Sequence, residues 1–528
     1  MTDEKQEEVL QGTVRGERKL GTLLLAAALA GAVAFRFYLL LALDFPVNDG
    51  ALFLEFVKTT AETFPYLPTF ADYNGLVLPF AYPPLSFWIG AAATKLGADS
   101  LSVIRIMPIL LNILYVLLFA LLLLKSGRSR LFTALAILFF AVNLRSFEWL
   151  LMGGGLTRGL GSLFLMLALL AATVPDEGRG RAISLGRMVL AGAAVGAAIL
   201  SHLEWGIVAA ASVLLSCALR GVSFKQFVTS SVIAGLSASA LVLPWLLFVV
   251  QIHGLEPFLA AGGTSGWDMG HIAGRLIGIG SMALASNALA VLGAVVLVVR
   301  RQWFWVGFIL ICVILTPRHA QTPAMLAVAV FSAQGIISAV ELGGRFIRSR
   351  KLLIGSVAAL VAALLTLNLY RTQLHSPLSF RILPPEMRQA MAWVAANEAG
   401  KRFAIINDRQ WPNDSSGEWF PSLASARSVT TVQGREWNGE YLRWDKLTRA
   451  LRASASCEEL DANLKPFGRF DFLWVETMQE CFRGPGYRPV FRNRLVEIYQ
   501  TAGEVVELLP SCRSSRNIQA LPRANGRS

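Results

Sequence analysis

Long apolar stretches dominate the sequence, and short polar connections separate them. A helix needs about 20 apolar residues to cross the hydrocarbon core of a bilayer. About eleven stretches approach that length, at residues 20–43, 101–124, 131–149, 152–174, 186–203, 205–219, 227–250, 273–299, 303–317, 323–342 and 352–370. Because 54% of the residues are hydrophobic and only 16% are charged, the sequence predicts a polytopic α-helical membrane protein with about eleven transmembrane helices.

The lysines and arginines between these stretches follow an alternation. Every second connection is basic, beginning with the tail 1–19 and continuing through 125–130, 179–187, 220–225, 300–301 and 345–351. Basic connections of membrane proteins lie in the cytoplasm. We therefore predict a multi-pass plasma-membrane protein whose N-terminus is cytoplasmic and whose chain after Arg371 is extracytoplasmic. The basic cytoplasmic connections then account for the net charge of +13, and no nucleic-acid partner is expected.

The composition changes after about His375. We predict a cytoplasmic basic tail at 1–19, a transmembrane domain at 20–372 with its first outer loop at 44–100, an extracytoplasmic α/β domain at 373–510 and a disordered tail at 511–528. Within the α/β domain, helices are expected at 384–393, 441–451 and 458–464, and strands at 403–406, 470–474 and 495–499.

The cysteines and aromatic residues of the predicted outer domain suggest two further features. In an oxidising compartment Cys457 and Cys481 could pair, which would leave Cys512 over. Four aromatic residues, Trp411, Trp419, Phe420 and Trp437, would suit carbohydrate binding.

The first outer loop carries a candidate general base. Asn48 and Asp49 follow the first apolar stretch, and polar groups so near a bilayer are costly unless they serve a purpose. Asp49 could accept a proton from an acceptor hydroxyl; alternatively, Asn48 or Asp49 merely caps the following helix. Tyr82-Pro83-Pro84 then fixes an extended turn before a short interfacial helix, and should place Tyr82 near Asp49.

The other outer connections also carry polar residues. Arg158 follows Gly153-Gly154-Gly155 and either grips an anionic group or extends its side chain from a tightly packed helix towards the membrane surface. The segment Ser201–Trp205 brings together His202, Glu204 and Trp205, and suits either a site or an interfacial turn. Arg318 and His319 repeat the combination of cation and imidazole, whereas His253, Trp267, Asp268 and His271 are weaker candidates.

This arrangement resembles the GT-C superfamily of integral membrane glycosyltransferases, which includes the protein O-mannosyltransferases and the aminoarabinose transferases. Asp49 lies where the family has its first-loop catalytic aspartate, and Tyr82-Pro83-Pro84-Leu85 resembles the Pro-Pro-Leu element of that loop. The sequence departs from the family pattern at two positions. The family often has His or Lys before the two prolines, where this chain has Tyr82, and often has a second acidic residue next to the aspartate, where this chain has Gly50. The likeness is greatest to little-characterised bacterial members.

The resemblance implies transfer of a sugar from a polyprenyl-phosphate carrier to a glycan, lipid or protein acceptor at the outer face of the membrane. Asp49 would then act as the base in an inverting reaction, Arg158 or Arg318 would neutralise the departing phosphate, and the remaining candidates would bind donor or acceptor. These are Asn48, Tyr82, His202, Glu204, Trp205 and His319. The resemblance also implies that the side chains meet in one pocket.

Three points stay open from the sequence. A divalent metal (Mg or Mn) would be compatible with Asp49 and His202, but nothing requires one. A lipid-linked saccharide transporter or flippase is a first alternative, although such proteins carry polar groups at mid-membrane depth. A non-catalytic cell-envelope scaffold is the second alternative.

Overall fold

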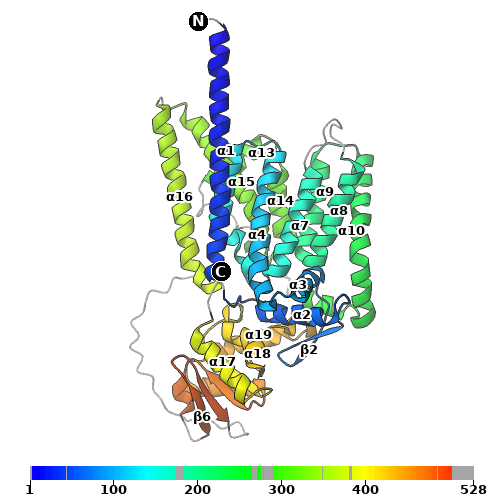
Figure 1. Ribbon diagram of the computed structural model, residues 1–528, viewed down its shortest axis with the longest axis vertical. Helices are drawn as coiled ribbons and strands as arrows, with labels where there is room; N and C mark the ends of the chain where they lie inside the picture. The colour runs from blue at the N-terminus through cyan, green and yellow to red at the C-terminus, as the bar shows by residue number, and fades with distance from the viewer. Residues whose placement is uncertain are drawn as a thin grey trace. The chain divides into compact units, whose positions relative to one another are not determined.

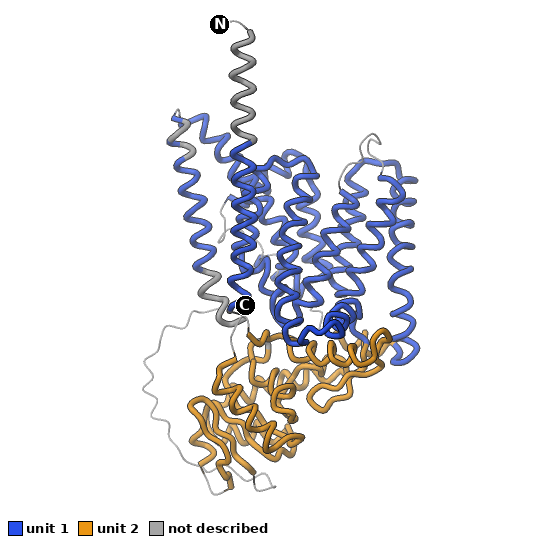
Figure 2. The backbone as a smooth tube through the Cα atoms, viewed as in Figure 1, with its two compact units in different colours: residues 1–43, 81–254, 265–380 blue, residues 44–80, 255–264, 381–528 orange. Residues whose placement is uncertain are grey.

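The computed structural model describes residues 3–42, 44–173, 183–263, 289–347, 349–379, 383–483 and 486–501, with short pieces at 270, 272–274 and 277–278. The chain forms two compact units, coloured separately in Figure 2. Unit 1 comprises residues 1–43, 81–254 and 265–380, and unit 2 comprises 44–80, 255–264 and 381–528. Some of the residues considered in the sequence analysis lie outside the described ranges, namely Trp267, Asp268, His271, Cys512 and the predicted disordered tail.

Unit 1 is helical. Its elements are α1 (Asp3–Ala42), α3 (Leu85–Lys95), α4 (Ser100–Lys125), α5 (Arg130–Val142), η1 (Leu144–Ser146), α6 (Glu148–Leu151), α7 (Gly155–Thr173), α8 (Leu185–Ser201), α9 (Leu203–Leu219), α10 (Phe224–His253), α13 (Leu289–Val299), α14 (Phe304–Leu315), α15 (Gln321–Gly343) and α16 (Arg350–Ser379). Helices α4, α7, α8, α9 and α10 pack side by side (Figure 1). Buried aromatic and aliphatic side chains, including Tyr115, Phe119 and Phe140, fill the space between the helices.

The helices of unit 1 differ in their capacity to cross a membrane. Five are long and apolar enough, namely Lys19–Leu41, Ser100–Lys125, Gly155–Thr173, Phe224–His253 and Gln321–Gly343. The bent pair α13–α14, with an angle of 115° between its helices, would be a sixth. Four other apolar helices of the described chain are shorter. The protein is thus a multi-pass membrane protein, but length and hydropathy do not establish eleven spans.

A buried arginine ties three helices of unit 1 together. Arg36 of α1 is fully buried, and its Nε donates to Asn112 Oδ1 of α4 at 2.7 Å. Its Nη1 donates to the carbonyl oxygen of Ala141, at the end of α5, at 2.6 Å, and its guanidinium carbon lies 4.4 Å from the centroid of the Phe147 ring. These bonds fix the end of α5, from which the chain continues towards Trp149 and Arg158.

Unit 2 contains a mixed five-stranded sheet with the order β4-β3-β5-β7-β6. Strands β3, β4 and β5 are parallel, and β7 is antiparallel to both β5 and β6. The strands are β3 (Arg402–Ile406), β4 (Arg427–Ser428), β5 (Phe472–Val475), β6 (Tyr487–Arg492) and β7 (Glu497–Thr501). All four residues of β5 and four of the five in β3 are buried, as expected for parallel strands covered on both faces.

Helices and a hairpin complete unit 2. The helices are α2 (Gly50–Thr63), α11 (Glu256–Gly262), α17 (Pro385–Asn397), α18 (Ser415–Ala424), α19 (Tyr441–Arg452) and α20 (Cys457–Leu464), with short 3₁₀ turns at Trp411–Asn413, Arg435–Asn438, Lys465–Phe467 and Gln479–Phe482. The hairpin pairs β1 (Phe70–Tyr73) with β2 (Leu76–Pro79). The predicted helices coincide with α17, α19 and α20, and the predicted strands overlap β3, β5 and β7. The hairpin, α18, β4 and β6 were not predicted.

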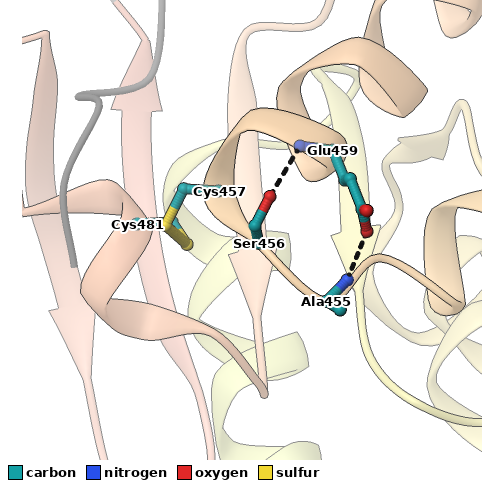
Figure 3. Close-up of a disulfide and its surroundings, with 5 residues drawn as sticks. All are labelled: Ala455, Ser456, Cys457, Glu459 and Cys481. Carbon is teal, nitrogen blue, oxygen red and sulfur yellow. Dashed lines mark hydrogen bonds between the residues drawn. A yellow bond between two sulfur atoms is a disulfide. The ribbon is translucent and has the colours of Figure 1, made fainter. Parts of the chain in front are cut away.

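A disulfide links α20 to the turn before β6. Cys457 and Cys481 are bonded, with their Cα atoms 5.4 Å apart, so the pairing that the sequence left open is confirmed (Figure 3). The start of α20 is also capped, because Ser456 Oγ accepts a hydrogen bond from the Glu459 amide at 3.2 Å. In return Glu459 Oε2 accepts one from the Ala455 amide at 2.8 Å.

The aromatic residues that seemed suited to carbohydrate binding lie mainly inside unit 2. Trp419 and Phe420 are fully buried, and Trp411 is 6% exposed. Phe420 packs against Phe403 and Trp474 in the core beside the sheet. The expectation that Trp411, Trp419 and Phe420 form a sugar-binding surface is therefore wrong, since their rings serve the hydrophobic core.

Candidate functional site

The segment that carries Asp49 is almost wholly buried in unit 2. Residues 45–48 and 50–54 are all buried, whereas Asp49 between them is only half-buried. Burial of the flanking residues follows from their apolar character, since Phe45, Pro46 and Val47 precede Asp49 and Ala51–Leu54 follow it. The fold thus presents one carboxylate from an otherwise enclosed stretch.

The backbone at this point is unusual. Asn48 and Asp49 have φ values of 68° and 80°, in the left-handed region that costs a non-glycine residue about 1 kcal/mol or more. Asp49 occupies the N-cap position of α2, yet its side chain makes no capping hydrogen bond. The alternative in which the Asp49 carboxylate merely caps the helix is therefore not what the structure shows. The Asn48 side chain is buried, with the residue 3% exposed.

Glu418 of α18 provides the helix cap instead. Glu418 is fully buried, and its Oε2 accepts hydrogen bonds from the Asn48 amide at 2.7 Å and from Gln433 Nε2 at 3.1 Å. Its Oε1 accepts a longer bond from the Ala51 amide at 3.4 Å. Burial, followed by the negative charge of Asp49, raises the pKa of Glu418, while the amide N–H groups at the start of α2 act in the opposite direction.

Sequence reasoning missed Glu418. The hydrogen bond between Asn48 and Glu418 joins residues 370 positions apart, so no local spacing announces it. Neighbouring contacts reinforce the bond: Trp419 Nε1 donates to the Pro46 carbonyl at 3.1 Å, and the Tyr73 hydroxyl donates to the Glu418 carbonyl at 2.7 Å. Two consecutive residues of α18 therefore hold the loop before α2.

In unit 1, Tyr82 contacts two segments that carry other predicted site residues. Pro83 and Pro84 lead into α3, as the sequence predicts, and leave Tyr82 half-buried ahead of the helix. Its hydroxyl lies 3.3 Å from Thr157 Oγ1 of α7. Its ring meets the ring of His202 edge to face, with the centroids 6.3 Å apart. Tyr82 thus joins the start of α7 to the turn between α8 and α9.

Arg158 is buried against a glycine and a tryptophan. The residue is only 5% exposed, so its side chain is packed inside unit 1. Its guanidinium carbon lies 5.0 Å from the centroid of the Trp149 ring. A Cβ atom built on Gly154 would lie 2.6 Å from this guanidinium, so Gly154 provides the room that Arg158 occupies. Trp149 was not singled out as a site residue from the sequence.

His202, Glu204 and His319 form the remainder of this cluster. His319 Nε2 lies 3.5 Å from Glu204 Oε2, and the His319 ring meets those of Trp149 and His202 at centroid distances of 5.0 and 6.2 Å. The positive charges of Arg158 and Arg318 act electrostatically on both His202 and Glu204. Among the described residues, no hydrogen-bond partner is found for the buried His202 Nδ1.

Trp205 differs from its neighbours. It is 4% exposed, lies in the helical core and meets the Tyr115 ring edge to face at 6.3 Å. Gly161 of α7 faces it, since a Cβ atom there would lie 2.9 Å from Trp205 Cβ. Because its ring is enclosed by protein, the structure argues against the sugar-stacking role expected from the sequence. Trp205 therefore packs the first turn of α9, which follows His202, into the helical core.

The predicted site residues thus fall into two groups, which we define as the cationic cluster and the acidic loop. The cationic cluster belongs to unit 1 and consists of Tyr82, Trp149, Arg158, His202, Glu204, Arg318 and His319. The acidic loop belongs to unit 2 and consists of residues 44–51 with Glu418.

The described side chains include no preassembled cluster of metal ligands. Within the described ranges, no group of three or more His, Cys, Asp or Glu residues is arranged to hold a metal ion. Both carboxylate oxygens of Glu418, the acidic neighbour of Asp49, already accept N–H donors. The proposal that follows assigns roles to the side chains of the chain alone.

The fold is similar to those of solved membrane enzymes. The oligosaccharyltransferase of Archaeoglobus fulgidus, crystallised with a tethered acceptor peptide, aligns with a TM-score of 0.52 and 14% identity, over 87% of this chain and 69% of that one. ArnT from Cupriavidus metallidurans in its apo state aligns with a TM-score of 0.53 and 14% identity, over 90% of this chain and 98% of that one. No protein-family model matches the sequence, and no curated protein matches it significantly.

The chain thus shares its fold with these two solved proteins, and the GT-C resemblance noted from the sequence is confirmed at the level of fold.

Proposed function

We propose that this protein is a membrane glycosyltransferase that moves a sugar from a polyprenyl-phosphate carrier to a hydroxyl acceptor. The observation that supports it best is the single half-buried carboxylate of Asp49 in a buried segment, with its capping role taken by Glu418. A carboxylate that neither caps a helix nor lies in the core is well suited to accept a proton. The GT-C fold agrees with this assignment.

In the proposed reaction Asp49 acts as general base. It takes the proton of the acceptor hydroxyl while the oxygen attacks the anomeric carbon of the donor sugar from the face opposite the phosphate. The new bond joins the acceptor oxygen to the anomeric carbon, and the bond between that carbon and the phosphate oxygen breaks. The configuration inverts, and polyprenyl phosphate leaves with the bonding electrons. Such a base contributes about 10²- to 10⁴-fold to the rate.

The cationic cluster would bind the departing phosphate. Arg158 and Arg318 supply positive charge, and a guanidinium matches two phosphate oxygens at once. Burial of Arg158 lowers the local dielectric and strengthens its attraction for an anion. Tyr82, His202 and His319 offer polar edges and ring faces for the sugar, and Glu204 orients His319 through their 3.5 Å contact.

We place the reaction at the outer face of the plasma membrane. The alternating basic connections support a cytoplasmic N-terminus and eleven crossings, counting as spans the four shorter apolar helices and each helix of the bent pair α13–α14. The Cys457–Cys481 disulfide supports an oxidising, extracytoplasmic location for the C-terminal α/β domain, because such bonds seldom persist in the cytosol. The acceptor is then a glycan, a lipid or a protein outside the cell.

Purified full-length protein in lipid nanodiscs, given a panel of polyprenyl-phosphate-linked hexoses and pentoses, tests this function. The assay measures polyprenyl phosphate released in the presence of candidate acceptors. Asp49→Asn should lower the turnover of the preferred donor about a thousandfold, because the amide cannot accept the proton. Asp44→Asn is the matched control: Asp44 lies in the same loop and pairs with Arg388 at 3.4 Å, so its turnover should stay within a few-fold of wild type.

Two other results would redirect the proposal. Full turnover by Asp49→Asn would exclude Asp49 as the base. Donor that crosses the membrane unconsumed would favour the flippase alternative, and binding without transport or consumption would favour a scaffold.

A further inference from the structure

We propose that Glu418 is a positioning residue for Asp49: its buried side chain holds the backbone of Asn48–Ala51, and so fixes the direction in which Asp49 points. This inference rests on the proposed role of Asp49 as base. It assigns to the C-terminal segment, from which Glu418 comes, a direct part in the chemistry of the first outer loop.

The contacts of Glu418 surround Asp49 along the chain. The residue before Asp49 donates its amide to Glu418 Oε2 at 2.7 Å, and the amide two residues after Asp49 points at Oε1 at 3.4 Å. Gln433 Nε2 holds Oε2 from a third side at 3.1 Å. The Asp49 backbone is therefore held from both sides, while its own side chain stays half-buried.

The left-handed backbone explains why such a clamp is needed. Asn48 and Asp49 both have positive φ values, and these conformations persist only where surrounding contacts impose them. Without Glu418, the first amides of α2 would lose their acceptor, and the two residues would relax towards ordinary backbone angles. The carboxylate of Asp49 would turn with them. A displacement of about 1 Å at a reacting group can cost about a hundredfold in rate.

Another contact of the same residue does not involve its carboxyl group and provides a control. The Tyr73 hydroxyl donates to the backbone carbonyl of Glu418 at 2.7 Å, not to its carboxylate. Tyr73→Phe therefore removes a buried hydrogen bond from the same residue while the clamp on Asn48 and Ala51 remains. A purely structural role for Glu418 predicts that the variants Tyr73→Phe and Glu418→Gln behave alike.

The test combines kinetics with hydrogen–deuterium exchange of the full-length protein in nanodiscs. In Glu418→Gln, an NH₂ group replaces one of the two carboxyl oxygens that accept amide N–H bonds. Whether the carboxyl of Glu418 is protonated or ionised, both of its oxygens can accept, but the amide nitrogen cannot and instead opposes an N–H donor. We expect kcat to fall about tenfold with KM nearly unchanged, and faster amide exchange in the peptide spanning 44–55. In Tyr73→Phe, both kcat and the amide exchange rate at 44–55 should stay within twofold of wild type.

A double mutant separates positioning from general weakening. If Glu418 acts through Asp49, adding Glu418→Gln to Asp49→Asn should not lower the residual turnover further. Should Glu418→Gln fail to fold, Gln433→Met removes one bond to the carboxylate and should reproduce the kcat loss at a smaller scale, with the same faster exchange. Wild-type kcat together with unchanged exchange at 44–55 would overturn the inference.

The proposed function can fail independently. If wild-type protein consumes no lipid-linked sugar while Glu418→Gln still speeds exchange at 44–55, the clamp stands and the assigned reaction is wrong. If turnover depends on Asp49 but neither Glu418→Gln nor the double mutant follows the expected pattern, the function stands and the positioning role is wrong.

Discussion

The acidic loop and the cationic cluster are built in opposite ways. In the acidic loop, backbone amides and a buried glutamate fix one half-exposed carboxylate, and the backbone itself is strained. In the cationic cluster, regular helices meet at short turns, and the His319 ring meets those of Trp149 and His202 edge to face, without backbone strain at these residues. The acidic loop fixes one carboxylate group, whereas the cationic cluster gathers positive charge and aromatic edges from several helices.

This difference suggests a division of labour. Proton transfer requires accurate placement of one carboxylate, and a strained, over-determined loop supplies it. Binding a diffuse phosphate charge tolerates more variation, and several cations and imidazoles on different helices can share it. We therefore expect substitutions of Asp49 and of the contacts that hold its backbone to change kcat or folding, and substitutions in the cationic cluster to change the affinity for the lipid phosphate.

The largest of three further effects should come from the backbone of Asn48. Asn48→Val places a β-branched residue at φ 68° and should cost about 2 kcal/mol of unfolding free energy, measured by chemical denaturation. Asn48→Gly removes the Asn48 side chain but adopts the same angle freely, so both stability and turnover should be kept. Loss of donor affinity in Asn48→Gly would instead support the substrate-binding role that the sequence suggested for Asn48.

A smaller effect should follow from crowding Arg158. The variant Gly154→Ala puts a Cβ atom 2.6 Å from the Arg158 guanidinium, which must shift away from Trp149. We expect KM for the lipid-linked donor to rise about tenfold at nearly constant kcat, equivalent to about 1.4 kcal/mol. Gly186→Ala is the matched control, because nothing lies within 4 Å of its new Cβ atom. A change in kcat alone would contradict the assignment of Arg158 to binding.

The smallest effect concerns pH. Burial and the charge of Asp49 raise the pKa of Glu418 above the ordinary 4.5, so the folded protein keeps a proton that the unfolded chain has released. Stability should therefore fall as pH rises above about 4.5, by at most about 1.4 kcal/mol per pH unit from this group. Glu418→Gln should flatten the dependence of unfolding free energy on pH, whereas the exposed Glu480→Gln should not. Equal slopes in all three proteins would show that Glu418 is ionised when folded.

Periodicity and charge alternation revealed much of the architecture. The apolar stretches became helices wherever the structure describes them, and the connections without the basic pattern supplied Tyr82, Arg158, His202, Glu204 and His319, which the fold brings together. The hairpin at 70–79 was missed although its turn, Asn74-Gly75, is a strong signal for two antiparallel strands.

Other features had no local signal. Glu418 gains its role from a partner 370 residues away, and nothing in Ser415–Phe420 distinguishes it from an ordinary surface glutamate. The burial of Trp205 and Trp419 likewise depends on which helices pack against them, since a tryptophan in a short polar segment suits either a core or a binding surface. Arg36 was hidden within an apolar span, where only Asn112 and the end of α5 explain its presence.

The most direct test of this account measures how tightly two variants bind polyprenyl phosphate. This product is expected to bind the cationic cluster, whereas Asp49 is expected to act only on the acceptor. Binding can be measured calorimetrically in nanodiscs with Asp49→Asn and Arg158→Gln. The account predicts that Asp49→Asn binds as tightly as wild type, while Arg158→Gln binds about ten- to a hundredfold more weakly, as expected for loss of a charged hydrogen bond. Weaker binding by Asp49→Asn with unchanged binding by Arg158→Gln would contradict it.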